Sequence, residues 1–432
     1  MRVAMLGWEF PPFVSGGLGI HCFELSRALA ALGVEIDFFM PATAKPVSVP
    51  WMRVIQVDES SFSEFSATPL FPFVLGPYAK PCGSGGKPCG RRGTGAAYGM
   101  DFFEAVDKYN ALAGQLVMLY HSKKPYDLVH CHDWITAKAG LSVKKALGLP
   151  LVFTVHSTEY DRTADLWPYE WILNVERAGV KAADRVIAVS NRSRQQLIER
   201  FGADPANVAV VYNAVDCGKF GCEGGEKVLG GREKVVLYHG RLSVQKGIEF
   251  FIRAAQKVLQ REKNVRFVVS GKGDLLPRLV EQAISLGIAD KITFAGYVED
   301  KSVPKLYAAS DVFVLPSVSE PFGITALEAM ASGTPVIVSK SSGVGEIANH
   351  CLKVDFWDVD ELANKILALL RYPVLGREMS QNESGEVRTF TWNATATKTL
   401  WAYGEAIAKR GAGAGGIAEP ERYQRQLSEI HP

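Results

Sequence analysis

The chain has 432 residues, of which 47% are hydrophobic and 22% charged, and its formal net charge is +2 at pH 7. This length exceeds the ~250–300 residues at which a single hydrophobic core stops growing, so we expect two or three domains. The balanced charge excludes a general attraction to nucleic acid or to an anionic membrane. Because no apolar run approaches the ~18 residues of a membrane-spanning helix, stable membrane insertion is not expected.

The N-terminus and the cysteines both favour the cytoplasm. The first nine residues combine one basic residue with a short apolar stretch and lack a small-residue cleavage site, which predicts a first strand rather than a secretion signal. The seven cysteines are odd in number and scattered, which argues against a disulfide framework. We therefore expect a cytoplasmic protein, and the sequence leaves a homo-oligomer open.

Short apolar segments alternate with helix-like segments through the first half of the chain. Between the first two, Leu25, Leu29 and Leu32 fall on one face of a predicted helix at 18–32. This alternation predicts βαβ units and a parallel sheet. The expected strands are residues 2–6, 34–39, 127–131, 151–155, 185–189 and 208–211.

A stretch rich in glycine and charge at 216–233 interrupts this alternation and is interpreted as a linker. The alternation then resumes, with helices expected at 248–259 and 275–286. We therefore predict a Rossmann-like domain at 1–216 and a second one at 217–390. The expected strands of the second half are residues 235–239, 265–270, 291–294, 311–315 and 335–338.

Three further segments stand outside these domains. Residues 391–409 form a predicted helix with too many aromatic side chains for a free surface, so this helix should dock on another part of the protein. Residues 410–432 are expected to be a flexible tail. Residues 76–99 are rich in glycine and proline and predict either a disordered insertion or a mobile loop that covers a site.

In parallel sheets of this kind, ligands bind beyond the carboxyl ends of the strands. After one such strand, a helix begins near Gly323, so the free amides of Gly323, Ile324 and Thr325 favour a phosphate. Glu320 before the turn and Glu328 within the helix can face the same crevice and would suit hydroxyl-rich partners. The alternative is a helix cap and a solvated surface acid.

A second strand end carries two cations. Gly240 and Arg241 follow the strand at 235–239, and Lys246 lies five positions further on, beside Gly247. Arginine can chelate a diphosphate in fork geometry and lysine acts as a point charge. Either residue alone fits an exposed surface position, but the pair between two glycines favours diphosphate binding.

The first half offers a glycine-rich loop between its first strand and first helix. Gly17 and Gly19 resemble part of a dinucleotide fingerprint, but the third position is Cys22 and the loop is too long for nicotinamide binding. A double glycine at a helix start can still bring backbone amides against a phosphate or a sugar.

Histidines and acids at other strand ends were weighed as metal ligands. His130, His132 and Asp133 lack a second pair with metal-ligand spacing, so a metal site is not expected there. His156 follows the next strand and is the better candidate for contact with a reacting sugar. Asp358 is better interpreted as a helix N-cap than as part of a metal-binding Asp-x-Asp. We expect neither a metal nor a cofactor.

Together these motifs resemble the large retaining glycosyltransferase family 4 and its relatives, the bacterial and archaeal glycogen and starch synthases. The resemblance spans residues 1 to about 405 and implies the GT-B fold, in which two Rossmann-like domains face each other across a cleft and a C-terminal helix crosses back to the first domain. The matching motifs are Gly16-Gly17-Leu18, His132-Asp133-Trp134, residues 183–190 and 210–216, Gly240-Arg241 with Lys246, and Glu320-x7-Glu328.

The resemblance also implies a role for each motif residue. Arg241 and Lys246 would grip the donor diphosphate together with the amides of Ile324 and Thr325. Glu328 would hold the ribose, Glu320 the donor sugar, and His156 and Asp133 would line the reaction centre. The nucleotide sugar is then a substrate, the anomeric configuration is retained and no metal is needed.

The implied reaction moves a hexose, glucose above all, from an ADP- or UDP-linked donor to the non-reducing end of an α-1,4-glucan. One departure weakens assignment to the bacterial ADP-glucose enzymes: Val14 stands where glycogen synthases usually carry a lysine. Three alternatives remain open, namely transfer to a lipid or small-molecule acceptor, a nucleotide-sugar 2-epimerase of similar fold, and a non-catalytic glycan-binding protein.

Overall fold

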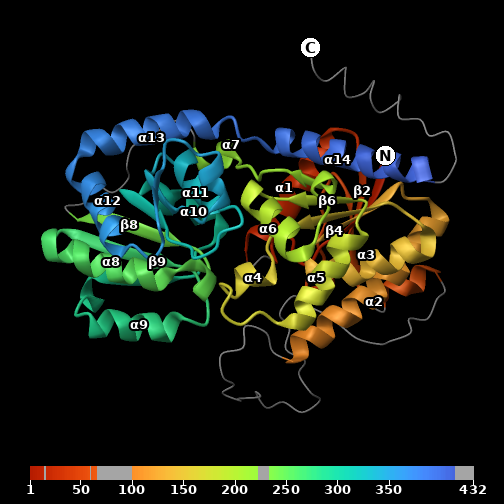
Figure 1. Cartoon of the computed structure of the whole chain (residues 1–432), viewed down its shortest axis with the longest axis horizontal. Coiled ribbons are helices and arrows are strands. Elements are labelled where there is room, and N and C mark those ends of the chain that lie inside the picture. The colour runs from red at the N-terminus through yellow and green to blue at the C-terminus, as the bar shows by residue number, and fades with distance from the viewer. Residues whose placement is uncertain (14–15, 59, 66–99, 222–232, 414–432) are drawn as a thin grey trace.

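The computed structural model describes residues 1–13, 16–58, 60–65, 100–221 and 233–413. Two α/β lobes lie side by side along the longest axis of the molecule, each with a parallel sheet between helices (Figure 1). We call the lobe built on strands β1 to β7 the first lobe and the lobe built on β8 to β13 the second lobe. Two such lobes confirm the predicted pair of Rossmann-like units.

The sheet of the first lobe has the strand order β3-β2-β1-β4-β5-β6-β7, and all its described pairs are parallel. Six of these seven strands were predicted from the sequence, and the five that are not at an edge carry buried apolar runs. The strand β3 was missed. The strands are β1 (Arg2–Leu6), β2 (Glu35–Pro41), β3 (Arg53–Val57), β4 (Leu128–His132), β5 (Leu151–Val155), β6 (Arg185–Ala188) and β7 (Val208–Val210).

Helices cover both faces of this sheet and close its core (Figure 1). The predicted first helix is present as α1 and begins at the glycine loop. The other helices of this lobe are the longer helices α2, α3, α5 and α6 and the single-turn helix α4. Their bounds are α1 (Gly17–Ala31), α2 (Met100–Lys123), α3 (Trp134–Leu147), α4 (Glu159–Arg162), α5 (Glu170–Ala182) and α6 (Asn191–Phe201).

The sheet of the second lobe has the order β10-β9-β8-β11-β12-β13. Its last strand, β13, was not predicted. The strands are β8 (Lys234–His239), β9 (Val265–Ser270), β10 (Ile292–Gly296), β11 (Val312–Leu315), β12 (Val336–Ser339) and β13 (Leu352–Val354). The helices are α7 (Cys217–Phe220), α8 (Ile248–Arg261), α9 (Leu276–Ser285), α10 (Val303–Ala308), α11 (Ile324–Ala331), α12 (Val359–Arg371) and α13 (Pro373–Val387).

The last helix, α14 (Trp392–Gly413), returns from the second lobe and lies along the first (Figure 1). Trp392, Ala396 and Tyr403 are buried in the same apolar cluster as α1 and β2. The Tyr403 hydroxyl also lies 2.7 Å from Nδ1 of His130, at the centre of the first sheet. The predicted crossing-back helix is therefore present, and it extends to Gly413, beyond the expected end at residue 409.

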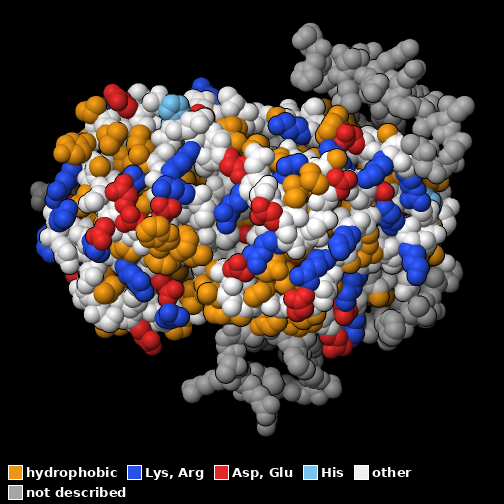
Figure 2. Space-filling view, in the orientation of Figure 1, with side chains coloured by type: hydrophobic (Ala, Val, Ile, Leu, Met, Phe, Trp, Pro, Cys, Tyr) orange, Lys and Arg blue, Asp and Glu red, His pale blue; other side chains and the backbone are white. Residues whose placement is uncertain are grey.

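Parts of the sequence expectations fall outside the described residues. These are the loop at 76–99, most of the predicted linker and nearly all of the predicted tail. Among the described residues, Cys22, Cys131, Cys217 and Cys351 are free thiols, and no helix is long and apolar enough to cross a bilayer. On the face shown in Figure 2, basic and acidic side chains are interspersed, which fits the small net charge.

The N-cap of α12 supplies a direct test of the Asp358 interpretation. Asp358 Oδ1 accepts the backbone N–H of Glu361 at 2.9 Å, as expected for a cap rather than a metal ligand. Asp358→Ala should lower the free energy of unfolding by about 1 kcal/mol, measured by urea denaturation. The matched control is Asp360→Ala, because Asp360 is exposed and only forms a surface pair with Lys257. Equal losses in both variants would contradict the capping role.

Candidate active site

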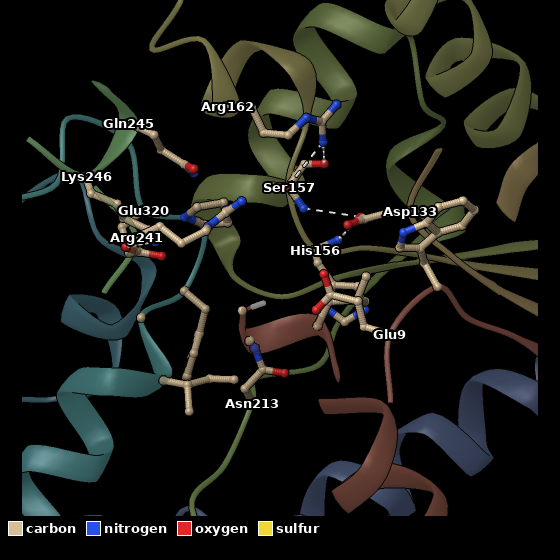
Figure 3. Close-up of a pocket in the computed structure, with 18 of the residues that line it drawn as sticks. Glu9, Asp133, His156, Ser157, Arg162, Asn213, Arg241, Gln245, Lys246 and Glu320 are labelled. Carbon is tan, nitrogen blue, oxygen red and sulfur yellow. Dashed lines mark hydrogen bonds and ion pairs between the residues drawn. The ribbon is translucent and has the colours of Figure 1, made fainter. Parts of the chain in front are cut away.

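A cleft with a free volume of about 220 Å³ lies between the two lobes, where the carboxyl ends of both sheets meet. It brings together nine of the eleven predicted site residues. These are Gly17, Asp133, His156, Arg241, Lys246, Glu320, Gly323, Ile324 and Thr325. Gly240 and Glu328 are not among the residues that line it. In Figure 3, Arg241, Lys246 and Glu320 stand on one side of this space, and Asp133 and His156 on the other.

The start of α11 lines the cleft on the side of the second lobe. Gly323 has φ 110°, and a Cβ atom there would lie 3.0 Å from Leu315 Cδ2 and 3.2 Å from Val344 Cγ1. A side chain at this position would therefore be strained and crowded. The chain turns sharply at Gly323, so the first amides of α11, at Ile324 and Thr325, line the cleft. This geometry suits an anion, because the first helical amides lack intrahelical partners.

Lys246 and Glu320 form an ion pair across two loops of the second lobe. Lys246 Nζ lies 2.6 Å from Glu320 Oε2, and Ser317 Oγ donates to the same oxygen at 2.9 Å. Lys246 sits on a single helical turn that ends at Gly247, where a Cβ would come within 2.1 Å of the Pro316 carbonyl oxygen. The two loops therefore pack closely and place both side chains in the cleft.

Arg241 is the uncommitted cation of the cleft. Its side chain is exposed, and it makes no hydrogen bond or ion pair with any residue that the structure describes. It lies beside Gly16 of the opposite lobe, since a Cβ at Gly16 would stand 3.8 Å from Arg241 Nε. An arginine that is free at the boundary of two lobes, above a helix N-terminus, is suited to chelate a diphosphate.

Glu328 lies deeper than the sequence predicted. It was expected to face the same crevice as Glu320, but its carboxylate is buried under α10 and accepts the Tyr307 hydroxyl at 3.0 Å. Burial raises the pKa of Glu328 to about 7. Neither glutamate is a solvated surface acid, because both are buried. Gly240 lies at the end of β8, and its carbonyl packs against Gly271 rather than against the cleft.

Asp133 anchors the first-lobe side. It adopts φ 59°, which is unusual for a residue with a side chain, at the turn between β4 and α3. Its Oδ1 accepts the backbone N–H of His156 at 2.6 Å and that of Ser157 at 3.3 Å. Burial raises the pKa of Asp133 to about 6, although the charge of Arg162 and the two N–H donors oppose this.

His156 and two further histidines meet beside Asp133. Burial lowers the pKa of His156 to about 3 and holds the pKa values of His21 and His132 well below their usual range. These imidazoles are therefore neutral at physiological pH. His132 Nδ1 lies 3.0 Å from His156 Nε2, and each ring has a nitrogen within 4.8 Å of the others, a spacing that metal sites also show.

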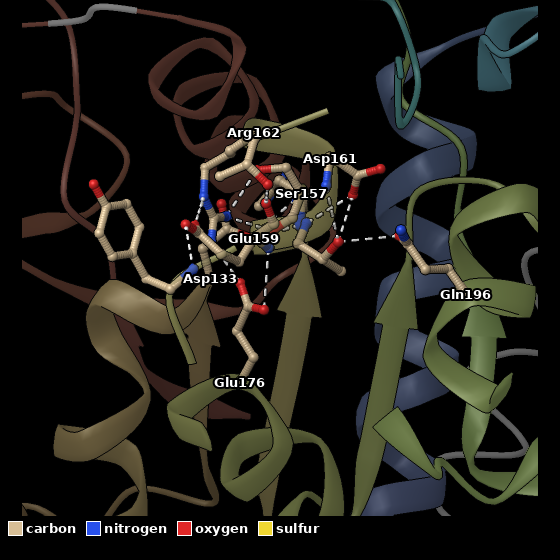
Figure 4. A network of polar contacts seen from close by, with 11 residues as sticks. Asp133, Ser157, Glu159, Asp161, Arg162, Glu176 and Gln196 are labelled. Carbon is tan, nitrogen blue, oxygen red and sulfur yellow. Dashed lines mark hydrogen bonds and ion pairs between the residues drawn. The ribbon is translucent and has the colours of Figure 1, made fainter. Parts of the chain in front are cut away.

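A buried ionic network around Arg162 supports this wall of the cleft (Figure 4). The Arg162 guanidinium contacts Glu159 at 3.0 Å and Glu176 at 2.6 Å, and it donates to the Ser157 carbonyl at 2.7 Å. Burial raises the pKa of Glu176 to about 7. The side chains of Arg162, Glu159 and Glu176 are all largely buried. Their contacts hold the segment that follows His156 in place.

The lobes contact each other beside the cleft. Ser319 Oγ of the second lobe donates to Asp161 Oδ1 of the first at 2.6 Å. The carboxylate of Glu346 accepts the first two amides of α6, from Asn191 at 2.8 Å and Arg192 at 2.7 Å. A carboxylate at a helix N-terminus is favoured by the helix dipole. The Ser319 contact joins the loop that carries Glu320 to the first lobe, and the Glu346 contacts join the turn Gly343–Glu346 to it.

The sequence interpretation missed several residues that line or support the cleft. His21 is a polar residue on the buried face of α1, one turn before Leu25, and that position was a usable signal. Asn213 lines the cleft without such a signal, because its partner His21 lies far away along the chain, and Arg162 lines it beside its near neighbours in sequence, Ser157 and Glu159. Gln245 also lines it, and its carbonyl accepts the amide of Val318 at 2.9 Å.

Comparison with known proteins assigns the chain to a family. Residues 225–385 match the family described as glycosyl transferases group 1, and residues 94–219 match glycosyltransferase family 4. An uncharacterised glycosyltransferase of Methanocaldococcus jannaschii is 34% identical over 81% of this chain and 83% of its own length. The chain therefore belongs to the family 4-type glycosyltransferases, as its motifs indicated.

Two other relatives have named activities. A glycogen synthase of Mycobacterium tuberculosis is 28% identical over 95% of this chain and 96% of its own length. A D-inositol 3-phosphate glycosyltransferase of Catenulispora acidiphila is 29% identical over 94% of this chain and 95% of its own length. The two differ in acceptor, so similarity at this level supports glycosyl transfer and leaves the acceptor undetermined.

Solved structures confirm the GT-B fold. A sucrose-phosphate synthase from Thermosynechococcus elongatus superposes with a TM-score of 0.76, at 24% identity, over 94% of this chain and 99% of its own. The catalytic domain of starch synthase IV from Arabidopsis thaliana, bound to ADP and acarbose, gives 0.69 at 18% identity over 94% and 99%. An Anabaena protein in complex with UDP-glucose gives 0.66 at 19% identity over 96% and 100%.

The raised pKa of Glu176 makes the stability of the fold depend on pH. Because the folded pKa of about 7 exceeds the ordinary value of 4.5, the folded state holds this proton more tightly than the unfolded chain. The contribution of this proton to the free energy of unfolding is therefore fully present at low pH and is lost as the pH rises through 7. In Glu176→Gln, the fall in unfolding free energy between about pH 5 and about pH 8 should therefore be smaller than in the unaltered protein.

Urea denaturation at the two pH values measures this difference. The control is Glu170→Gln, on the same helix, because the Glu170 side chain is 68% exposed. That variant should keep the pH dependence of the unaltered protein. An unchanged dependence in Glu176→Gln would show that Glu176 does not titrate in this range.

Proposed function

We propose that this chain is a retaining glycosyltransferase that moves glucose from a nucleoside diphosphate donor, ADP- or UDP-glucose, to the non-reducing end of an α-1,4-glucan. The main observation in support of the transfer reaction is the position of Arg241. It lies near the N-terminus of α11 and beside the Lys246–Glu320 ion pair, and its side chain has no partner among the described residues. Similarity to glycogen synthase over nearly the whole chain supports the glucan acceptor. Structural neighbours bound to ADP or to UDP-glucose support the nucleotide donor.

In the proposed complex, the diphosphate lies between Arg241, Lys246 and the first amides of α11. These groups stand ready to stabilise the negative charge that develops on the leaving diphosphate, and such preorganised electrostatics is often the largest catalytic contribution. When a diphosphate takes Lys246, Glu320 loses its partner in the ion pair and becomes free to accept hydroxyls of the donor sugar. Glu328, which already accepts Tyr307, would bind the ribose from beneath.

We propose that the anomeric configuration is retained, as the similarity to glycosyltransferase family 4 implies. Asp133 is a first-lobe carboxylate that lines the cleft, but its Oδ1 already accepts two backbone N–H groups, which makes it a poor nucleophile. We therefore propose that the acceptor attacks from the face on which the diphosphate departs. In this proposal, the cationic groups of the second lobe neutralise the negative charge of the leaving diphosphate by themselves. The proposed reaction therefore needs no metal and no cofactor.

Transfer to inositol phosphate is the second candidate, and a specific similarity favours it. The relative from Catenulispora acidiphila covers 94% of this chain at 29% identity, and the glycogen synthase covers 95% at 28%. A small acceptor of this kind would also fit a cleft of about 220 Å³. An epimerase would differ from both candidates, since it would consume the donor with no acceptor present.

Removal of the lysine should strongly reduce transfer. Lys246→Ala deletes one of the groups that stabilise the departing diphosphate, so kcat should fall by roughly 10²–10³. The measurement is release of nucleoside diphosphate at saturating donor. The control is Lys257→Ala, because Lys257 lies on α8, pairs with exposed Asp360 of α12 and does not line the cleft. Near-normal turnover in Lys246→Ala would remove this lysine from the mechanism.

The acceptor is tested by a panel of donors offered with glycogen, maltooligosaccharides, inositol phosphate, a lipid extract or no acceptor. We expect ADP- or UDP-glucose to be consumed only with an α-glucan. Stimulation by inositol phosphate alone would establish the second candidate and overturn the glucan proposal. Consumption of the donor without any acceptor would indicate the epimerase instead.

A further inference from the structure

His156 was predicted to contact the reacting sugar, but the histidine behind it, His132, has no role in the reaction described so far. His132 ends β4 and is fully buried, whereas His156 follows β5 and lines the cleft. The strands β4 and β5 are neighbours, so these two residues stand side by side at the carboxyl edge of the sheet. His132 Nδ1 and His156 Nε2 are 3.0 Å apart.

The relative orientation of the rings identifies the contact as a hydrogen bond. Their planes differ by only 24° and their centroids are 5.3 Å apart, the arrangement of two rings whose nitrogens point at each other. A metal ion on the line between them would need a separation of about 4 Å, because each Zn–N bond takes ~2.0–2.1 Å. The 3.0 Å gap leaves no room for an ion and suits one shared proton.

The surroundings decide which ring donates. His132 Nε2 is buried and has no hydrogen-bond partner among the described residues. If His132 accepted at Nδ1, its own proton would sit on Nε2 as a buried side-chain donor without an acceptor among the described residues, which is uncommon in folded proteins. If His132 donates from Nδ1, only a lone pair is left unsatisfied at Nε2. The second arrangement is the less costly one.

The third histidine does not disturb this assignment. His21 Nδ1 lies 2.6 Å from Asn213 Oδ1, an oxygen that can only accept, so the His21 proton is on Nδ1. Its Nε2 therefore holds a lone pair and donates to neither neighbour. The His21 ring packs edge-on against His156, with centroids 4.4 Å apart. All three rings are neutral, since burial lowers their pKa values.

We propose that His132 is a positioning residue: it donates its Nδ1 hydrogen to His156 Nε2 and thereby fixes His156 as an Nδ1–H donor toward the cleft. The tautomer of a histidine is set by the hydrogen bond that its other nitrogen makes. With Nε2 occupied by His132, Nδ1 is the polar atom that His156 has left for a ligand. In the proposed function, this N–H donates to a hydroxyl oxygen of the donor sugar.

The first test needs no activity. Selective ¹⁵N labelling of histidine, with His156 assigned by loss of its signals in His156→Gln, reports which ring nitrogen carries the proton. We expect the proton on Nδ1 of His156. A proton on Nε2 would overturn the proposal, and so would stoichiometric binding of Zn²⁺ in a calorimetric titration, because the ion would have to replace the hydrogen bond.

The second test uses two amides that differ only in reach. In His132→Asn, the side-chain amide occupies the place of Nδ1 and can still donate to His156, whereas in His132→Gln it takes the place of Nε2 and cannot. We expect His132→Asn to keep kcat within a few-fold of the unaltered protein. His132→Gln should lose about tenfold in kcat, the size of one buried hydrogen bond. The same pair should separate in the ¹⁵N spectra, with the Nδ1–H form kept only by asparagine.

Equal kcat and equal spectra in the two variants would overturn the positioning role, and comparison of their melting temperatures excludes a difference in folding. The tautomer belongs to the structure alone, whereas the change in kcat rests on the proposed function. If His156 carries its proton on Nδ1 but no nucleotide sugar is turned over, the proposed function fails and the tautomer assignment stands.

Discussion

The site depends on the contact between the two lobes, which the hydrogen bond from Ser319 Oγ to Asp161 Oδ1 makes at the cleft and which Glu346 makes at the start of α6. Each lobe supplies only one wall, so the site exists only when the walls face each other at a defined distance. Ser319 precedes Glu320 in the chain, and Asp161 accepts the backbone N–H of Thr158, two residues after His156. One short contact therefore links the loops that carry the central groups of both walls.

The two walls differ in charge, and the difference fits the reaction. The second lobe presents Arg241 and Lys246 above a helix N-terminus, where anions are stabilised. The first lobe presents Asp133 and neutral His156, with a buried network behind them in which Glu159 and Glu176 share Arg162. A diphosphate is thus attracted to one wall only. The sugar that it carries would then face the other wall.

The fold was largely predictable from the sequence, because buried central strands of a parallel sheet are continuous apolar runs. The two missed strands are edge strands. In β3, Arg53 and Gln56 interrupt the apolar pattern, and Arg53 instead pairs with buried Asp37 of β2. β13 spans only Leu352–Val354 and is half-buried at two of its positions. Neither strand carries the apolar run by which the others were found.

The site was predictable where its residues follow strands or begin helices, since strand ends converge in this fold. It was not predictable where a residue is placed by a distant partner. Glu328 was expected in the cleft because its spacing from Glu320 on a helix allows that, but Tyr307 of α10 holds it below. His21 depends on Asn213, 192 positions away, and no periodicity in the sequence reports such a pair.

Burial also explains why histidines, rather than lysines, form the wall opposite the cations. A cation without an acidic partner at the position of His156 would compete with Arg241 and Lys246 for the donor's negative charge, whereas Arg162 is already paired with Glu159 and Glu176. Burial lowers the pKa values of His21, His132 and His156 and keeps these rings neutral, so they act through the direction of single N–H groups and not through charge. The aromatic load of α14 contributes here, because Trp392 packs against His21 and Tyr403 against His130. The helix that crosses back between the lobes thus helps keep this wall dry.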